Sequence, residues 1–366
     1  MMTVADNMHA NGNGAAAHQN NAHRQSSCVV LFKSGDCKWL QCESACEIAS
    51  FLDNAKIAWV NYTVNDVKTN GEEIATALGF SGGFVSKLLE AHYSDYEDND
   101  VELGLQVPAV TVSRLEVTIN PMIILMRRGL ILTIASGEVQ RLIRFSRYAD
   151  TFFRKIPKNA SWQDALTLAL LRILEENNDR NFEHLREIEM QADDLSKDLM
   201  DFKMPRDRIA PALYGMKHAL ITYMNVLWAT LDVTNSLRYG DAEIITDNKK
   251  ILERMSLLSA GVTQHLQLSE HMSEVLASGL EVLQTIYNNQ LQVLNNRLAF
   301  LATWLAIVGT AVLVPNTLAT IYGIPSVSEH TSYSFIVWSL IVISLMSTVL
   351  VFLVIKFKGW IPKGEW

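Results

Sequence analysis

The sequence predicts a cytoplasmic α/β domain, followed by a stalk of long helices and two transmembrane helices at the C-terminal end. Three observations support this architecture. Uncharged apolar segments occupy residues 298–322 and 333–355. Strand-like and helical patterns alternate between residues 28 and 138, and long helical patterns with few breakers fill the region between these parts.

The composition indicates that most of the chain lies in water. The 366 residues carry a formal net charge of −8, with 49% hydrophobic residues and a mean hydropathy of +0.11. An acidic chain with no basic patch argues against nucleic acid and for cations as partners. The pattern changes define the expected segments: a disordered tail at 1–27, the α/β domain at 28–138, long helices at 139–247, a stalk helix at 248–297, transmembrane helix 1 at 298–323, an outer loop at 324–332, transmembrane helix 2 at 333–355 and a basic C-terminus at 356–366.

The α/β domain is expected from short apolar runs bounded by turn residues. Arg127-Arg128-Gly129 has the composition of a hairpin turn between the last two runs. Helical spacing appears at 44–54, where Ser44 can cap, and at 72–91 around a glycine break. The expected strands are 29–33, 39–42, 57–64, 109–112, 122–126 and 130–135.

Long helices are expected from residue 139 onward. Helices at 139–156 and 161–202 flank Pro157, and Ser161 is the expected cap of the second. Another helix ends at Tyr239. The stalk helix then starts near residue 248, and its apolar positions recur at steps of three and four, as self-association of the stalk would require: Ile251, Met255, Leu258, Val262, Leu266 and Met272.

The two apolar segments have the length of membrane spans. About 20 residues of helix cross a hydrocarbon core of roughly 30 Å. Arg297 precedes the first segment, and Lys356, Lys358 and Lys363 follow the second, whereas the loop between them carries no Lys or Arg. The positive-inside rule then predicts a multi-pass protein of the plasma or inner membrane with both termini in the cytoplasm. Two buried helices of a soluble protein are the alternative, but such helices rarely avoid charge over this length.

Together these features resemble the CorA-type divalent-cation (magnesium) transporter family. The resemblance is most specific from Asn296-Arg297 to Tyr322-Gly323, where the stalk becomes the first span and ends at a Tyr-Gly corner. It implies a homopentameric, CorA-like funnel in the lipid bilayer, with the first spans lining a central pore. It also implies passive movement of hydrated Mg²⁺, with Mg²⁺ as cargo and possible regulator. No organic cofactor is expected, and no catalytic constellation suggests an enzyme.

The corner after the first span departs from the family's signature. The family carries Gly-Met-Asn there, and its zinc-transporting branch resembles Gly-Ile-Asn, whereas this chain has Gly323-Ile324-Pro325 after Tyr322. Pro325 offers a carbonyl oxygen but no side-chain amide, so the selectivity ring of asparagines that the family implies is missing. A transporter of Zn²⁺, Co²⁺ or Ni²⁺ and a non-conducting membrane scaffold or sensor therefore remain alternatives.

The family's register places a set of residues on the pore-facing side of the first span. In that register Leu313 forms a hydrophobic ring, and Asn316 and Thr320 offer oxygens to the hydration water of the ion. The carbonyl freed by the kink at Pro315 would face the pore, unless Asn316 only repairs that kink. The set is Gly309, Leu313, Asn316, Thr320 and Gly323.

A second polar stripe competes with this register. Thr303, Thr310 and Thr317 are spaced by seven, and they would either face the pore themselves or form hydrogen bonds between helices.

Acidic residues suggest a regulatory site. Glu90 resembles the family's inter-subunit Mg²⁺-sensing position. Ten carboxylates also crowd the helix expected at 161–202, where bound Mg²⁺ would relieve repulsion or where the acids form a solvated face: Glu175, Glu176, Asp179, Glu183, Glu187, Glu189, Asp193, Asp194, Asp198 and Asp201.

Overall fold

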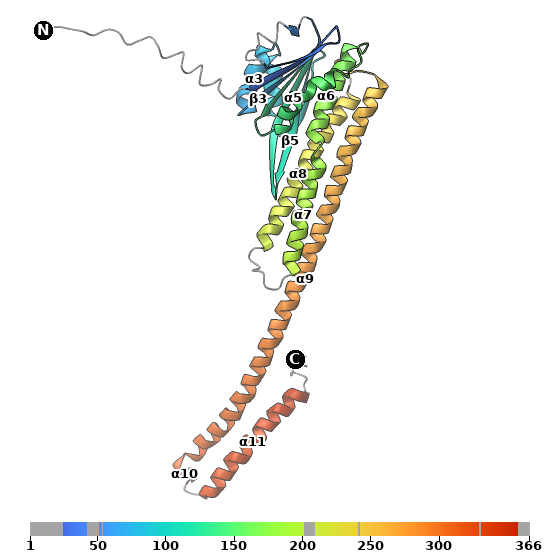
Figure 1. Cartoon of the computed structure of the whole chain (residues 1–366). Coiled ribbons are helices and arrows are strands. Elements are labelled where there is room, and N and C mark those ends of the chain that lie inside the picture. Colours follow the sequence, from blue (N-terminus) through green and yellow to red (C-terminus); the bar gives the residue numbers. More distant parts are fainter. Residues whose placement is uncertain are drawn as a thin grey trace, which may run out of the picture. The chain divides into compact units, whose positions relative to one another are not determined.

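The computed structural model describes residues 25–41, 51–52, 54–200, 209–240, 242–328 and 331–357 (Figure 1). Most of the expected tail, most of the expected helix at 44–54, Asp201, Lys358 and Lys363 lie outside the described residues. The chain falls into two compact units, Met1–Ala277 and Ser278–Trp366.

A mixed seven-stranded sheet forms the centre of the first unit. Its strands are β1 (Gln25–Phe32), β2 (Cys37–Gln41), β3 (Ala55–Val64), β4 (Asp95–Asp98), β5 (Glu102–Ser113), β6 (Glu116–Arg127) and β7 (Leu130–Ser136). They lie in the order β2-β1-β3-β7-β6-β5-β4. The pair β3–β7 is parallel and the other neighbours are antiparallel.

Each expected strand overlaps an observed one, but β5 begins at Glu102 and β6 at Glu116, well before the expected starts at 109 and 122. Arg127 pairs with Leu130 across a two-residue turn, in which Gly129 has a φ of +79°, so the predicted hairpin is confirmed. Strand β1 begins at Gln25, three residues inside the segment for which the sequence suggests a disordered tail. Strand β4 was not predicted, because its sequence Asp-Tyr-Glu-Asp lacks an apolar alternation.

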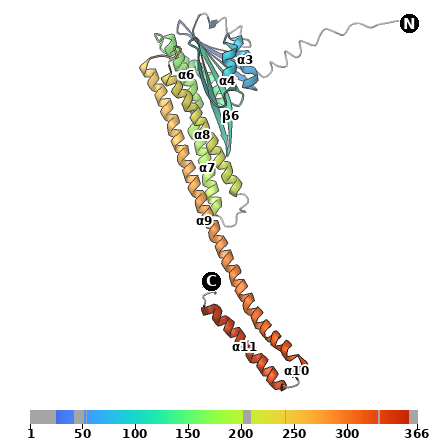
Figure 2. The same ribbon diagram turned by 180° about the vertical axis from the view of Figure 1, so that it is seen from behind.

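The period of two along β1 separates the cores on the two faces of the sheet. Val29 and Leu31 pack with α5 (Gln140–Phe153) and α6 (Trp162–Asn178) on one face. Cys28 and Val30 pack with α3 (Val67–Ala77) and α4 (Gly82–Glu90) on the other face. Figure 2 shows α3 and α4 covering that second face. Burial on both faces explains why the central strands are apolar nearly throughout.

The helix expected at 161–202 is two helices. Ser161 caps the first as predicted, since its hydroxyl accepts from the Asp164 amide at 2.9 Å. Helix α6 ends at Asn178, and α7 (Asn181–Met200) follows. Contacts with other elements hold this break: the Tyr223 hydroxyl of α8 (Ile209–Tyr239) donates to the Asn181 carbonyl oxygen at 2.6 Å.

The first part of α9 (Lys249–Tyr322) packs within its own chain. Ile251 and Met255 join the core beside the sheet. Val262 and Leu266 pack with α7, α8 and the end of β5, and they are 0% and 3% exposed. The expectation that these positions serve self-association of the stalk is therefore wrong, because the spacing of three and four serves packing inside one subunit.

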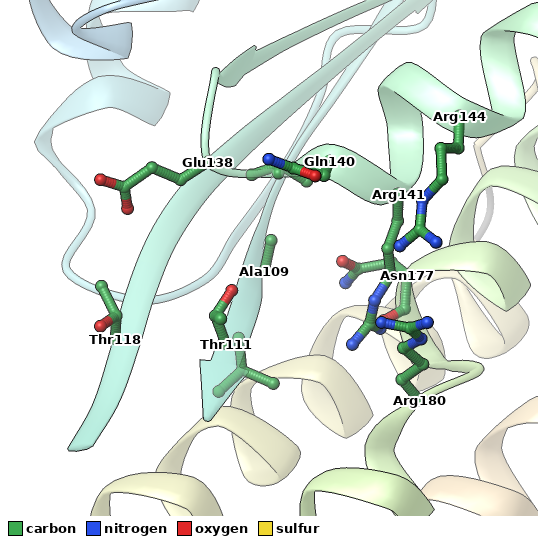
Figure 3. Close-up of a pocket in the computed structure, with 11 residues that line it drawn as sticks. Ala109, Thr111, Thr118, Glu138, Gln140, Arg141, Arg144, Asn177 and Arg180 are labelled. Carbon is green, nitrogen blue, oxygen red and sulfur yellow. The ribbon is translucent and has the colours of Figure 1, made fainter. Parts of the chain in front are cut away.

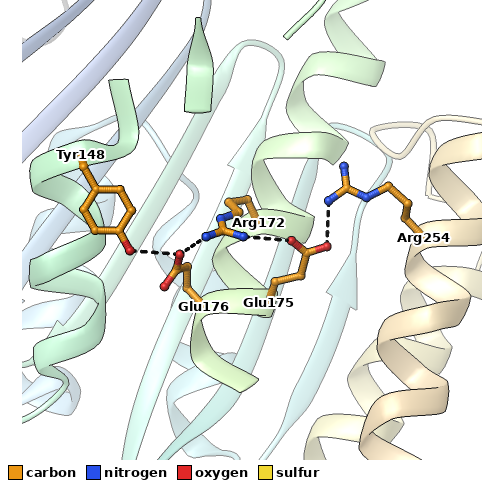
Figure 4. A network of polar contacts seen from close by, with 5 residues as sticks. All are labelled: Tyr148, Arg172, Glu175, Glu176 and Arg254. Atoms are coloured by element: carbon orange, nitrogen blue, oxygen red, sulfur yellow. Dashed lines mark hydrogen bonds and ion pairs between the residues drawn. The ribbon is translucent and has the colours of Figure 1, made fainter. Parts of the chain in front are cut away.

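A polar network ties this part of α9 to α6 and α5 (Figure 4). Arg254 of α9 donates to Glu175 of α6 at 2.8 Å. Arg172 lies 3.5 Å from Glu175 and also pairs with Glu176. Glu176 accepts from the Tyr148 hydroxyl at 3.1 Å, so the network reaches α5.

The second unit contains the end of α9, the short helix α10 (Pro325–Ser328) and α11 (Tyr333–Phe357). Helix α9 and residues Tyr333–Val354 of α11 are long and apolar enough to cross a membrane, and 0% of either apolar window is buried in the single chain. Large side chains such as Leu345 and Trp338 are 64% and 68% exposed. Surfaces of this kind suit lipid or other copies of the chain.

Candidate ion-conduction site

The end of α9 has one partly covered side. Half-buried residues recur there at steps of three and four: Phe300, Thr303, Ile307, Thr310, Val314, Leu318 and Tyr322. Tyr322 on this side shares a hydrogen bond of 3.3 Å with Ser339 of α11. This regular spacing identifies the side of α9 that faces α11.

Most of the expected pore-facing residues lie on the opposite side. Leu313, Asn316, Thr320 and Gly323 are exposed, and Gly309 is half-buried. At 100° per residue, these positions share one face that points away from the face of Thr303 and Thr310. In a single subunit, the face is therefore uncovered.

Each threonine hydroxyl on this helix is used in the same way. Thr303, Thr310, Thr317 and Thr320 each donate to the carbonyl oxygen four residues earlier, at 2.8 Å. A hydroxyl has one proton, so its outward-facing oxygen keeps only acceptor capacity. The water molecules bound to Mg²⁺ present hydrogens outward, and acceptors are the groups that they need. Thr320 on the exposed face has this property.

Pro315 lies on the side that faces α11. It borders a hollow lined by α11 residues Leu340, Ile341, Ser344, Leu345, Thr348 and Val349. Proline has no N–H, so the carbonyl oxygen of residue 311 lacks its usual donor. Whether this carbonyl oxygen faces the pore stays a prediction. The Asn316 side chain makes no hydrogen bond to any described residue.

The corner after α9 is a compact turn. The Gly323 amide donates to the Ala319 carbonyl oxygen at 2.9 Å, and the Ile324 amide donates to Ile321 at 3.2 Å. Pro325 is the first residue of α10. Proline suits this position, since an N–H there has no helical partner. Pro325 thus has a structural use at the position where the family's signature asparagine stands.

Glu90 is the last residue of α4, and its side chain is exposed. Lys87, one turn earlier, forms an ion pair with Glu97 of β4. The described residues contain no group of three or more His, Cys, Asp or Glu side chains that could hold a metal ion. A regulatory role for Glu90 remains a prediction.

Several of the clustered carboxylates already have ion-pair or hydrogen-bond partners within the chain. Glu175 and Glu176 pair with arginines, Glu183 pairs with Arg180, and Asp194 pairs with Lys197. Glu187 accepts from the Arg114 amide at 2.9 Å. Mutual repulsion among these carboxylates is therefore smaller than the sequence suggests, because the compensating groups come from other positions and elements.

The comparisons with known proteins agree with this architecture. The model of the family described as CorA-like Mg²⁺ transporter protein matches residues 54–356. The complete structure of the CorA magnesium transporter from Methanocaldococcus jannaschii is similar at a TM-score of 0.66 and 17% identity, covering 93% of this chain and 99% of that one.

Two further solved structures share the fold. The full-length CmaX protein has a TM-score of 0.61 and 15% identity, covering 92% of this chain and 98% of that one. The ZntB cytoplasmic domain from Vibrio parahaemolyticus has a TM-score of 0.53 and 13% identity, covering 73% of this chain and 99% of that one. No curated protein matches the sequence.

Proposed function

Because the chain belongs to the family of CorA-like Mg²⁺ transporter proteins, a family of divalent-cation transporters and not of enzymes, we propose that it conducts hydrated Mg²⁺ through a central pore. Movement is passive and follows the electrochemical gradient of the ion. The observation that carries the proposal is the uncovered face of α9, on which Leu313, Asn316 and Thr320 are exposed.

Several copies are needed to enclose such a pore. One α9 and one α11 leave the face of Asn316 open to their surroundings, and bare polar groups in lipid are costly. A ring of α9 helices with α11 outside would cover this face and enclose a path. We propose a homopentamer, as in the resembling family, with both termini in the cytoplasm and two spans per subunit in the plasma or inner membrane.

The chemistry of the exposed face suits a hydrated ion. Asn316 and Thr320 are neutral oxygen ligands, and Mg²⁺ gives up its water reluctantly, so contacts through hydration water are expected. Leu313 would form an apolar constriction one turn away. No thiolate or imidazole, the ligands that Zn²⁺ prefers, lies among the described residues of this face.

Flux into proteoliposomes tests the proposal. Entry of Mg²⁺, Co²⁺, Ni²⁺ and Zn²⁺ is compared in purified full-length protein with a fluorescent indicator for each ion. Mg²⁺ is expected to enter fastest. Faster Zn²⁺, Co²⁺ or Ni²⁺ entry would assign the chain to a transition-metal transporter, and absence of flux for all four ions would assign it to a scaffold or sensor.

Cysteine scanning tests the pore face itself. A charged thiol reagent is expected to block flux through cysteine at positions 309, 316 and 320, whereas cysteine at 303 and 310 stays unmodified. Modification at positions 303 and 310 without modification at 316 would overturn the assignment in favour of the face of Thr303, Thr310 and Thr317.

A further inference from the structure

A surface cavity of about 380 Å³ lies in the first unit, between the β5–β6 hairpin, the start of α5 and the junction of α6 with α7. Arg141 and Arg144 line it from α5, and Arg180 lines it from the junction. Figure 3 shows the three guanidinium groups gathered on one side of the cavity. The carboxylate of Glu138 lies on the other side and points away from them. Positive charge is thus concentrated here, in a chain whose formal net charge is −8.

Negative charge balances these arginines only in part. Arg180 has an ion pair with Glu183, at 3.1 Å between Nε and Oε2. Arg141 instead donates to the Asn177 carbonyl oxygen at 2.8 Å and contacts the His184 ring. Burial and then the Arg141 charge lower the pKa of His184 to about 4, so the imidazole is neutral at pH 7. The nearby carboxylates of Asp179 and Glu183 offset part of the Arg141 charge, whereas Arg180 and Arg144 add to the positive charge around it. Three guanidinium groups therefore share these two carboxylates.

The start of α5 adds to the positive potential. No side chain caps the helix at Val139, and its first turn contains no acidic residue. The guanidinium of Arg144 has no ion pair or hydrogen bond to any described residue. A cation near a helix N-terminus is unfavourable, because the helix dipole is positive at that end. A bound anion would offset both the dipole and the arginines.

The opposite wall of the cavity offers neutral hydrogen-bonding groups. Thr111 and Thr118 pair across β5 and β6, and both line the cavity. Hydroxyl groups of this kind can donate to the acceptor oxygens of an anionic ligand.

We propose that this cavity binds a phosphate-bearing small molecule, held by Arg141, Arg144, Arg180 and the start of α5. Guanidinium groups bind phosphate oxygens in pairs, and a phosphate group carries the multiple negative charge that three arginines can balance. The cavity falls within the range of about 300–1,000 Å³ for small-molecule sites, so it can hold a phosphate ester as well as phosphate itself. Such a site would make the cytoplasmic unit responsive to a soluble anion, independently of the transported cation.

Isothermal titration of inorganic pyrophosphate into the full-length protein in detergent tests the proposal. EDTA removes divalent cations that would bind pyrophosphate. Constant ionic strength keeps electrostatic screening the same in all titrations. Saturable binding is expected for the unchanged protein. Arg144→Gln should raise the Kd about tenfold or more, because one charge-assisted contact is lost while no internal contact of Arg144 is broken.

Arg147→Gln is the matched control, with the same charge change on the same exposed helix face outside the cavity. It should leave the Kd unchanged. An equal rise of the Kd in both variants would mean that pyrophosphate responds only to the overall charge of the protein and not to this cavity. Absence of saturable binding at millimolar pyrophosphate would overturn the proposal. An oligomer that dissociates on Arg144→Gln, without pyrophosphate binding to the unchanged protein, would assign the cavity to a carboxylate of a neighbouring copy.

Discussion

The hydroxyl groups of Tyr322 and Ser339 lie 3.3 Å apart and share a hydrogen bond. Tyr322 is the last residue of α9, and Ser339 lies two turns into α11. The bond therefore joins the two candidate membrane helices next to the corner that contains Gly323 and Pro325. It also fixes which side of α9 faces α11, and so which side is left for a pore.

A double-mutant cycle should detect this bond. Tyr322→Phe and Ser339→Ala are expected to couple by about 0.6 kcal/mol, the average for hydrogen bonds between membrane helices. The cycle is needed because the Ser339 hydroxyl gives its one proton to the Ile336 carbonyl oxygen at 2.9 Å and accepts from the Tyr322 hydroxyl, so the single change Ser339→Ala loses two contacts. Unfolding of the detergent-solubilised protein supplies the four free energies, and strict additivity would mean that the bond contributes nothing.

Thr320→Val and Thr310→Val form a matched pair for the pore. Both threonines donate to a backbone carbonyl oxygen at 2.8 Å, but Thr320 is on the exposed face and Thr310 is half-buried toward α11. Valine keeps the shape and removes the outward acceptor. Thr320→Val should lower Mg²⁺ flux in proteoliposomes by about tenfold or more, whereas Thr310→Val should leave it nearly unchanged. The reverse pattern would favour the stripe of Thr303, Thr310 and Thr317.

His184 should make the stability of the protein sensitive to acid. Its pKa is about 4 in the folded chain and about 6.5 in a free peptide, so the unfolded chain binds a proton first as pH falls. Stability is expected to drop by a few kcal/mol between pH 6.5 and pH 4 and to show no contribution from this group above pH 7. Thermal unfolding of His184→Gln against pH should show a shallower decline over that window. A slope that is unchanged in His184→Gln would contradict this prediction.

Gly104→Ala should destabilise the contact between α4 and the sheet. A Cβ at Gly104 would lie 2.2 Å from Leu88 Cδ1 and 2.8 Å from Phe84 Cε1, and Leu88 is fully buried. Relief of this clash requires repacking of α4, at a cost of about 1–3 kcal/mol. Gly83→Ala on α4 is the control, because a Cβ there meets nothing within 4 Å. Chemical denaturation should show a loss for Gly104→Ala and no loss for Gly83→Ala.

The elements with a strong local signal could be predicted from the sequence. The turn at Arg128-Gly129 and the cap at Ser161 depend on a few adjacent residues, and both occur where expected. The break between α6 and α7 depends instead on contacts such as that of Tyr223 with Asn181, which local helix propensity does not report. Strand β4 likewise exists through its pairing with β5.

The two sites differ in the same way. A period of 3.6 residues places Asn316 and Thr320 on one face of a helix, so their common orientation could be predicted. That Pro315 lies on the side of α9 facing α11 could not be predicted, because it depends on where α11 packs. The arginine cavity was missed since Arg180 is nearly forty positions from Arg141, and only the folded chain brings them together.

The network that begins at Arg254 has a consequence for how the base of α9 responds to ions. Arg172 and Arg254 carry two positive charges, and Glu175 and Glu176 carry two negative ones, so the set is neutral. A divalent cation gains little from carboxylates that are already paired, and salt screens partly buried pairs less than exposed ones. Ile251 and Met255 also hold the base of α9 in the apolar core. The attachment of α9 to α6 is therefore expected to change little with the concentration of divalent cations.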